Sequence, residues 1–136
     1  MPAVMASTNV ELLEQALAAV NARDVDGFAA LMADDFEWVT PLAPVGPGSY
    51  YGREGVREFF EVASEVNAKA RIDTIRDLGD RALLLGAVSW RHGDGPSLQR
   101  PFAAVAHLEH GRLKRIHSFR DANDAWNAAG LGRPRH

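Results

Sequence analysis

Residues 70–121, "ARIDTIRDLGDRALLLGAVSWRHGDGPSLQRPFAAVAHLEHGRLKRIHSFRD", set the architecture of this chain. Apolar runs of strand length alternate there with the short links "GD", "GDGPS" and "GR". Links of this length and composition join antiparallel strands as hairpins. The segment therefore predicts a meander of four strands. It is followed by "ANDAWNAA", residues 122–129, which predicts a last helical turn that Gly130 closes.

The residues before this segment predict helices. "STNVELLEQALAAVNARD", residues 7–24, places apolar residues at helical spacing behind three candidate N-caps, Ser7, Thr8 and Asn9. A shorter series, Phe28, Leu31 and Met32, predicts a second helix that stops near "ADD". "REGVREFFEVASEVN", residues 53–67, restores the helical period.

Between the second and third helices, two segments have different signals. "FEWVT", residues 36–40, is rich in aromatic and β-branched residues and predicts a strand. "PLAPVGPGSYYG", residues 41–52, is rich in proline and glycine and predicts a loop. Helices first and strands afterwards give an α+β class with the helices on one face of a curved sheet. We expect a single domain over residues 8–131, with tails at residues 1–7 and 132–136.

The composition narrows the classes of function. Hydrophobic residues make up 46% and charged residues 24% of the 136 residues, as in ordinary globular domains. A net charge of −3 argues against nucleic acid as a partner, and the absence of cysteine excludes disulfides and thiolate chemistry. No apolar run is long enough for a membrane span, and the first residues lack signal-peptide features. We therefore expect a cytoplasmic protein without a membrane partner.

Three stretches carry a resemblance to a known family: "ALAAVNARDVDGFAALMADDFEWVTP", "YYGREGVREFF" and "GRLKRIHSFRDANDAWNAAGL". In their order they resemble the nuclear transport factor two superfamily, and within it the SnoaL-like polyketide cyclases, over about residues 8–131. The resemblance implies a cone-shaped α+β barrel with a mostly antiparallel sheet. It also implies a pocket for a small molecule between sheet and helices, and a homodimer.

Ketosteroid isomerases, which are similar in overall plan, provide a contrast. The resemblance implies that their catalytic aspartate falls on Thr40, their helical tyrosine on Ala16 and their second aspartate near Val105. Threonine is not a carboxylate base, and alanine and valine donate no hydrogen bond to an oxyanion. The steroid isomerase reaction by that route is therefore not expected.

The candidate catalytic residues are Asp121, His107 and His117. The resemblance to SnoaL-like cyclases implies an acid/base role for Asp121 and a histidine partner at His107. A carboxylate in an apolar pocket has a raised pKa, which suits proton transfer near neutral pH. His117 shares the strand face of Asp121, and a hairpin at "EHGR" would bring His107 opposite His117 or Arg115. The alternative is that Asp121 or Asn123 only caps the last helix.

The expected substrate wall comes from several strands. Phe36, Trp38 and Thr40 share one face of their strand, because side chains alternate with period two. The complete set of candidate substrate-binding residues is Phe36, Trp38, Thr40, Phe59, Trp90, Arg115 and Phe119. Aromatic residues of this kind stack on planar ligands, although they also serve as ordinary core.

These residues predict a small-molecule enzyme that works without a cofactor or metal. Asp121 would move a proton next to a carbonyl of an aromatic or polyketide-like substrate, with His107 or His117 polarising the oxygen, in a cyclase or isomerase reaction. A metal site of His107, His117 and Asp121 has the right composition but no spacing that forces the three together. Two further alternatives are epoxide hydrolysis, with Asp73 or Asp77 as a second carboxylate, and non-catalytic ligand binding or dimeric interaction.

Overall fold

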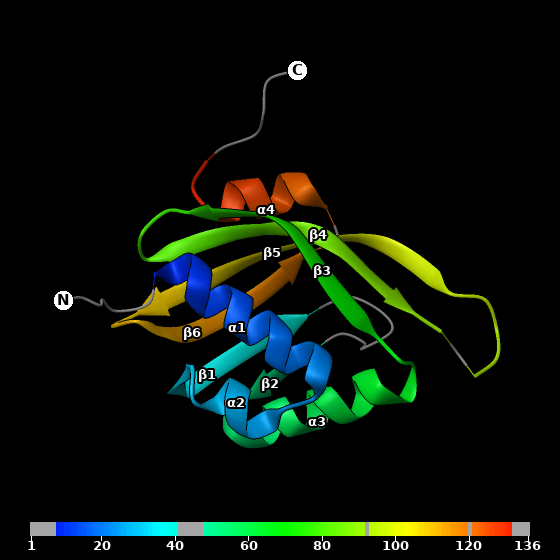
Figure 1. The fold of residues 1–136 in the computed structure, drawn as a ribbon. Coiled ribbons are helices and arrows are strands. Elements are labelled where there is room, and N and C mark those ends of the chain that lie inside the picture. The colour runs from blue at the N-terminus through cyan, green and yellow to red at the C-terminus, as the bar shows by residue number, and fades with distance from the viewer. Residues whose placement is uncertain (1–7, 41–47, 92, 120, 132–136) are drawn as a thin grey trace.

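The computed structural model describes residues 8–40, 48–91, 93–119 and 121–131 (Figure 1). The elements, in chain order, are α1 (Asn9–Ala22), α2 (Val25–Ala29), β1 (Met32–Thr40), β2 (Gly48–Tyr51), α3 (Gly52–Glu65), β3 (Lys69–Asp77), β4 (Arg81–Trp90), β5 (Leu98–Glu109), β6 (Arg112–Phe119) and α4 (Ala122–Ala128). The predicted α+β class is confirmed, and so is the meander from β3 to β6.

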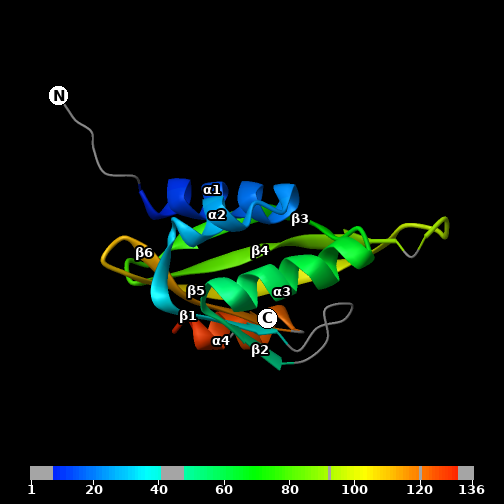
Figure 2. The ribbon, with the colours of Figure 1, turned by 90° about the horizontal axis from the view of Figure 1, so that it is seen from below.

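The described strands form one curved sheet in the order β2-β1-β6-β5-β4-β3. The pairing of β1 with β6 is parallel, and the other pairs are antiparallel. Helices α1, α2 and α3 lie on one side of the sheet and α4 on the other (Figures 1 and 2). We call the side of α1 and α3, which Trp38, Ala104 and Ile116 face, the inner face. The side of α4, which Val105 and His117 face, is the outer face.

Helix α1 begins at a complete capping box. The Thr8 hydroxyl accepts a hydrogen bond from the Glu11 backbone N–H at 3.0 Å, and the Glu11 carboxylate accepts one from the Thr8 N–H at 2.9 Å. Two of the N–H groups that a helix leaves without partners are satisfied in this way. Thr8 is therefore the N-cap among the candidates; Ser7 lies outside the described residues.

Two asparagine side chains fasten α1 to the edge strand β3. The Asn21 amide donates to the Ala70 carbonyl and accepts from the Ala70 N–H, both at 2.9 Å. At the other end, the Asn9 Nδ2 group donates to Asp77 at 3.0 Å and to the Gly79 carbonyl at 2.8 Å. An edge strand leaves backbone N–H and carbonyl groups without partners. The Asn21 amide pairs with both groups of Ala70, as the backbone of a neighbouring strand would.

A glycine permits the bend between β3 and β4. Gly86 pairs with Ile72, just before the register of β3 shifts. A Cβ atom built on Gly86 would lie 1.8 Å from the Arg71 carbonyl oxygen. No side chain fits at that distance, so the close approach of β3 and β4 at this register shift depends on glycine.

Two predictions around β1 are wrong. Leu31 and Met32 are not helical: α2 ends at Ala29 and β1 begins at Met32, not at residue 36. The pairing of Met32 with Leu113, and the hydrogen bond from Leu113 N to the Leu31 carbonyl at 2.8 Å, override the short helical pattern.

The predicted loop at residues 41–52 is also wrong in part. Residues 48–51 form β2, antiparallel to β1, with Tyr50 opposite Trp38. The rest of that segment, residues 41–47, lies outside the described residues. A four-residue edge strand tolerates the glycine content that made this segment resemble a loop.

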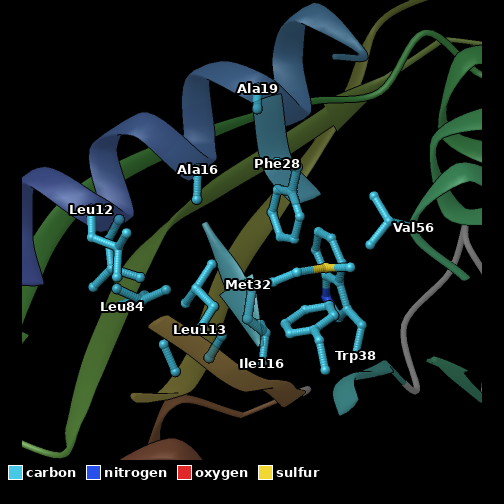
Figure 3. Close-up of a cluster of buried hydrophobic side chains, with 14 of the residues drawn as sticks. Leu12, Ala16, Ala19, Phe28, Met32, Trp38, Val56, Leu84, Leu113 and Ile116 are labelled. Atoms are coloured by element: carbon cyan, nitrogen blue, oxygen red, sulfur yellow. The ribbon is translucent and has the colours of Figure 1, made fainter. Parts of the chain in front are cut away.

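The main core lies between the inner face and the helices (Figure 3). Phe28 of α2 and Phe36 of β1 are completely buried, and their rings meet edge to face at 5.5 Å between centroids. Leu113 of β6 is also completely buried. Burying each such side chain contributes about 1.5–3 kcal/mol to stability. A second cluster, with Leu83, Val105 and Ala125, packs α4 on the outer face.

Candidate ligand-binding site

A cavity of about 100 Å³ lies on the inner face between the sheet, α1 and α3. Its wall is almost entirely apolar. The lining residues are Leu13, Ala16, Leu17, Val20, Arg23, Phe28, Trp38, Thr40, Phe59, Ala63, Ala68, Lys69, Ala70, Ile72, Leu84, Val88, Phe102, Ile116 and Ser118. No carboxylate and no imidazole of the described residues belongs to this lining.

Stacked rings form one wall of the cavity. The rings of Trp38 and Phe59 are 4.0 Å apart between centroids at an interplanar angle of 23°, and Phe28 stacks on Trp38 at 5.4 Å. Trp38 and Phe59 therefore lie in the cavity wall, as predicted. Phe36 does not; it lies in the core, edge to face with Trp38 at 6.0 Å.

Two hydroxyl side chains lie next to each other in the otherwise apolar wall. Val39 of β1 pairs with His117 of β6, so Thr40 and Ser118, the next residues of two parallel strands, are neighbours on the inner face. Thr40 is 4% and Ser118 3% exposed. Among the described residues, nothing forms a hydrogen bond with the Ser118 hydroxyl. A buried hydroxyl in that state favours a ligand that offers an acceptor or donor.

Two cations border the cavity where α1, α3 and β3 meet. Arg23 is the C-cap of α1, and its guanidinium donates to the carbonyls of Val20, at 2.7 Å, and Ala63, at 3.3 Å, and to that of Ala68. Lys69 is exposed, and its ammonium donates to the Asn21 carbonyl at 3.0 Å. The positive charges stand beside helix carbonyls, where cations are stabilised.

Asp121 lies outside the cavity, and the prediction that it faces the interior is wrong. It is exposed and is the N-cap of α4, where its carboxylate accepts a hydrogen bond from the Asn123 N–H at 2.7 Å. The chain leaves β6 at Phe119, and the first turn of α4 supplies unpaired N–H groups that a carboxylate satisfies. The capping alternative is therefore the observed one.

His107 and His117 lie on the outer face, away from the cavity. His107 pairs directly with Arg115, which was one of its two predicted partners, and His117 pairs with Val105. Burial lowers the pKa of both imidazoles below the ordinary value, and the Arg115 charge lowers them further. The neutral form of both side chains is therefore favoured, and neither residue belongs to the described lining of the cavity.

The other predicted wall residues divide between the two faces. Thr40 lines the cavity, whereas Trp90 does not belong to the lining and packs against Ala63, Val66 and Ala68. Arg115 is on the outer face, with Nε 3.4 Å from the Glu37 carboxylate. Phe119 is there too, stacked on His117 at 4.2 Å.

The alternative of a metal site at His107, His117 and Asp121 does not fit the observed positions. His107 and His117 share the outer face, while Asp121 is committed to the α4 cap. No group of three histidine and carboxylate side chains suited to a metal ion occurs in the described ranges.

The sequence interpretation missed Ser118, Phe28 and the two cations. The signal for Ser118 was present, since Ile116 and Ser118 share the strand face opposite His117. An apolar neighbour on a strand face is a better guide to the interior than an ionisable residue. Arg23 and Lys69 come together only through the packing of α1, α3 and β3, which no local pattern shows.

Comparisons with known proteins agree with this fold. The fold is similar to that of solved nuclear transport factor two-like and ketosteroid isomerase-like proteins, at 23% and 16% identity. The model of the SnoaL-like domain family matches residues 13–116. The chain therefore belongs to the SnoaL-like domain family. Among curated proteins, none is similar to it at a significant level.

Three solved structures illustrate the likeness of fold. TerC, co-crystallised with polyporic acid, is 23% identical, with 90% of this chain and 97% of TerC covered and a TM-score of 0.74. A nuclear transport factor two-like protein of unknown function from Burkholderia pseudomallei K96243 is 23% identical, with 89% and 96% covered and a TM-score of 0.72. A proposed polyketide cyclase from Pseudomonas putida KT2440 is 21% identical, with 87% and 95% covered and a TM-score of 0.67.

The described helices include none that is both long and apolar enough to cross a membrane.

Proposed function

We propose that this chain binds a small, flat, apolar molecule with a carbonyl group in the inner-face cavity. The observation that carries the proposal is the pairing of the Trp38–Phe59 stack with the buried Ser118 hydroxyl. Rings of the ligand would lie against the aromatic wall, and the hydroxyl would donate to the carbonyl oxygen. The ligand's carbonyl would give the Ser118 hydroxyl an acceptor inside the cavity.

Binding without proton transfer is favoured over acid/base catalysis. A general base must come within hydrogen-bond reach of the proton it removes. The described lining offers hydroxyls and two cations but no carboxylate or imidazole. Residues 41–47, "PLAPVGP", which follow Thr40 in the chain, contain no ionisable side chain either. The catalytic roles of Asp121, His107 and His117 stay predictions, and the geometry does not support them.

A cyclase or isomerase of SnoaL-like type is the second candidate. Thr40 and Ser118 stand side by side, as two donors to one oxyanion would. Membership of the SnoaL-like family and the likeness to the proposed Pseudomonas cyclase support this candidate. TerC was crystallised with polyporic acid, which supports a cyclic carbonyl compound as the ligand class. A reaction at these hydroxyls would need its base from the ligand or from solvent.

The epoxide hydrolase alternative has little support. Its second carboxylate would be Asp73 or Asp77. Asp73 is exposed and paired with Arg71 at 2.8 Å, while Asp77 accepts hydrogen bonds from Asn9 and the Gly79 N–H. Neither belongs to the cavity lining.

The homodimer and the cytoplasmic location also stay predictions. Analytical ultracentrifugation across a hundredfold range of protein concentration would test the first, and fractionation of the native cells the second.

A matched pair of alanine variants tests the cavity as the binding site. Ala16 faces the cavity from α1, and Ala18 on the same helix is exposed. The probe is 2-acetonaphthone, a neutral bicyclic ketone, and binding is measured by calorimetry. Ala16→Phe fills the space and should weaken binding at least tenfold, whereas Ala18→Phe should leave it unchanged. Equal binding by wild type and Ala16→Phe would refute the proposal.

A second variant tests the same site if Ala16→Phe does not fold. Ser118→Ala removes only the hydroxyl, and Thr74→Val provides a control that removes an exposed hydroxyl on β3. The loss of one hydrogen bond should weaken binding of the ketone about threefold to tenfold. Binding of naphthalene, which has no carbonyl, should not change. An equal loss for both probes would contradict the assigned hydrogen bond.

A further inference from the structure

The residues that line the cavity differ in burial. Phe28, Trp38 and Ser118 are buried. Lys69 is, among the described lining residues, the exposed one, and it starts the edge strand β3. We call the part of the cavity beside Lys69 the exposed end, since a ligand group there would lie next to solvent.

The exposed end carries positive charge that no described carboxylate balances. Arg23 and Lys69 both line the cavity, and neither forms an ion pair within the described residues. Arg23 already donates to three carbonyls and to the Ser64 hydroxyl, so its donors are committed while its charge remains. A ligand anion near this end would be attracted by both charges.

Lys69 has hydrogen-bonding capacity left. An ammonium group has three donors, and one of them is directed to the Asn21 carbonyl at 3.0 Å. The remaining donors are available at the exposed end. A carboxylate there would accept a charge-assisted hydrogen bond without displacing the contact to α1.

The volume of the cavity limits the ring system. About 100 Å³ is of the same order as the engineered apolar cavity of about 150 Å³ that binds benzene. One ring, or two fused rings of which one reaches the opening, can be accommodated. A ligand of four fused rings would have to displace the Trp38–Phe59 wall, since protein interiors are close-packed.

From these observations we infer that the ligand is an aromatic carboxylate of one or two rings that also carries a ring carbonyl, with its rings against Trp38 and Phe59, its ring carbonyl at Ser118 and its carboxylate at Lys69. This inference rests on the proposed function, because it assumes that the cavity is occupied by a small molecule. It adds the charge and the size of the ligand. The alternative for Lys69 is a purely structural contact with the end of α1.

The test compares ligands that share one ring system. 2-Naphthoate carries the carboxylate, 2-acetonaphthone is its neutral analogue, and pyrene-1-carboxylate keeps the charge on four rings. Binding of each is measured by calorimetry to wild type, Lys69→Gln and Arg71→Gln. Arg71 is the matched control, since it is a cation on the same strand that pairs with Asp73 and does not line the cavity.

Lys69→Gln should weaken 2-naphthoate about threefold to fivefold, the amount expected for an ion pair at an exposed rim. It should leave the binding of 2-acetonaphthone unchanged, and Arg71→Gln should change the binding of neither ligand. Added salt should weaken the binding of 2-naphthoate but not that of 2-acetonaphthone, because salt screens the interaction between charges. Lys69→Arg should retain the preference for the carboxylate. Pyrene-1-carboxylate should bind at least tenfold more weakly than 2-naphthoate.

The outcomes separate the two proposals. If 2-acetonaphthone binds and depends on Ala16, but 2-naphthoate is no tighter and is indifferent to Lys69→Gln, the carboxylate assignment is wrong while the binding function stands. Tighter binding of the pyrene compound overturns the size limit. If neither naphthalene compound binds wild type, the binding function itself fails, and the ligand class fails with it.

Discussion

The two faces of one sheet have opposite chemistry. Along β6, Ile116 and Ser118 point to the inner face and its cavity, while Arg115 and His117 point to the outer face. The ionisable residues of the final strands thus lie on the outer face, where burial and neighbouring positive charges lower the pKa of the two histidines. The described lining of the cavity has only hydroxyls and a cationic rim as its polar groups. In this chain, the residues with the most reactive side chains are therefore not the residues that line the cavity.

Polar residues of the outer face are aligned across neighbouring strands. Direct pairing aligns Arg81, His107, Arg115 and Glu37 in one row across β4, β5, β6 and β1. We call these four residues the polar row. Beside it, α4 covers an apolar patch that includes Val105. Within the row, Arg115 forms an ion pair with Glu37, although its Nε forms no hydrogen bond. The inner face depends on apolar packing instead.

The largest effect on stability is expected at Gly86, where the absence of a side chain lets β3 and β4 approach closely. Gly86→Ala places a methyl group 1.8 Å from the Arg71 carbonyl oxygen. Alanine normally stabilises a strand relative to glycine, but here the clash should lower the free energy of unfolding by about 3 kcal/mol or prevent folding. Urea unfolding measures it, with Ser89→Ala on the outer face of β4 as the control. A wild-type midpoint for Gly86→Ala would show that β3 can move away.

The next effect concerns the closure of the inner face by α1. Asn21→Ala removes both hydrogen bonds to the backbone of Ala70. The Ala70 groups lose their partner at a half-buried edge, so the free energy of unfolding should fall by about 1–3 kcal/mol. Asn127→Ala, at an exposed position on α4, should change it by less than about 0.5 kcal/mol. Hydrogen exchange at the Ala70 amide should speed up only in Asn21→Ala.

Local signals were sufficient to predict most of the fold. The Thr8 cap and the spacing of leucines after it predicted α1, and short glycine-containing links predicted the meander. The start of β1 at Met32 was missed because its pairing partner, Leu113, is about eighty residues away in the chain. β2 was missed because a short edge strand has the composition of a loop.

The site was predictable where strand parity decides it. Period two placed Trp38 and Thr40 on one face of β1, and both line the cavity. The resemblance to isomerases aligned their tyrosine with Ala16, which also lines the cavity, although Val105 faces outward. Asp121 was chosen for its chemistry, but at a strand-to-helix junction a carboxylate is taken up by the helix N-terminus.

A smaller effect on the outer side distinguishes a cap from a catalyst. Asp121→Ala should lower the free energy of unfolding by about 1 kcal/mol through loss of the α4 cap, and Asp121→Asn, which retains a capping oxygen, by much less. Neither should alter binding of 2-acetonaphthone. If Asp121→Asn kept its stability but lost binding, or lost turnover once a substrate is found, the carboxylate would act at the cavity after all.

The smallest effect comes from the histidines of the outer face. Burial and the Arg115 charge hold the pKa of His107 and His117 below the ordinary imidazole value of 6.5 in the folded protein. Arg81 also lowers that of His107, whereas Asp80 and Glu37 oppose the shifts. As the pH falls below about 6.5, the unfolded chain therefore takes up protons before the folded one does.

The contribution of these histidines to stability should accordingly be constant above about pH 7 and decrease as the pH falls below about 6.5. It should stop decreasing once the histidines are protonated in the folded protein as well. Urea unfolding at several pH values should show a shallower decline for the double variant His107→Gln/His117→Gln. His110→Asn, in the exposed turn between β5 and β6, should keep the wild-type decline. Binding of 2-acetonaphthone should not follow this pH dependence in any variant. A ketone affinity that titrated with the two histidines would mean that the faces communicate through β6, and the separation drawn between them would not hold.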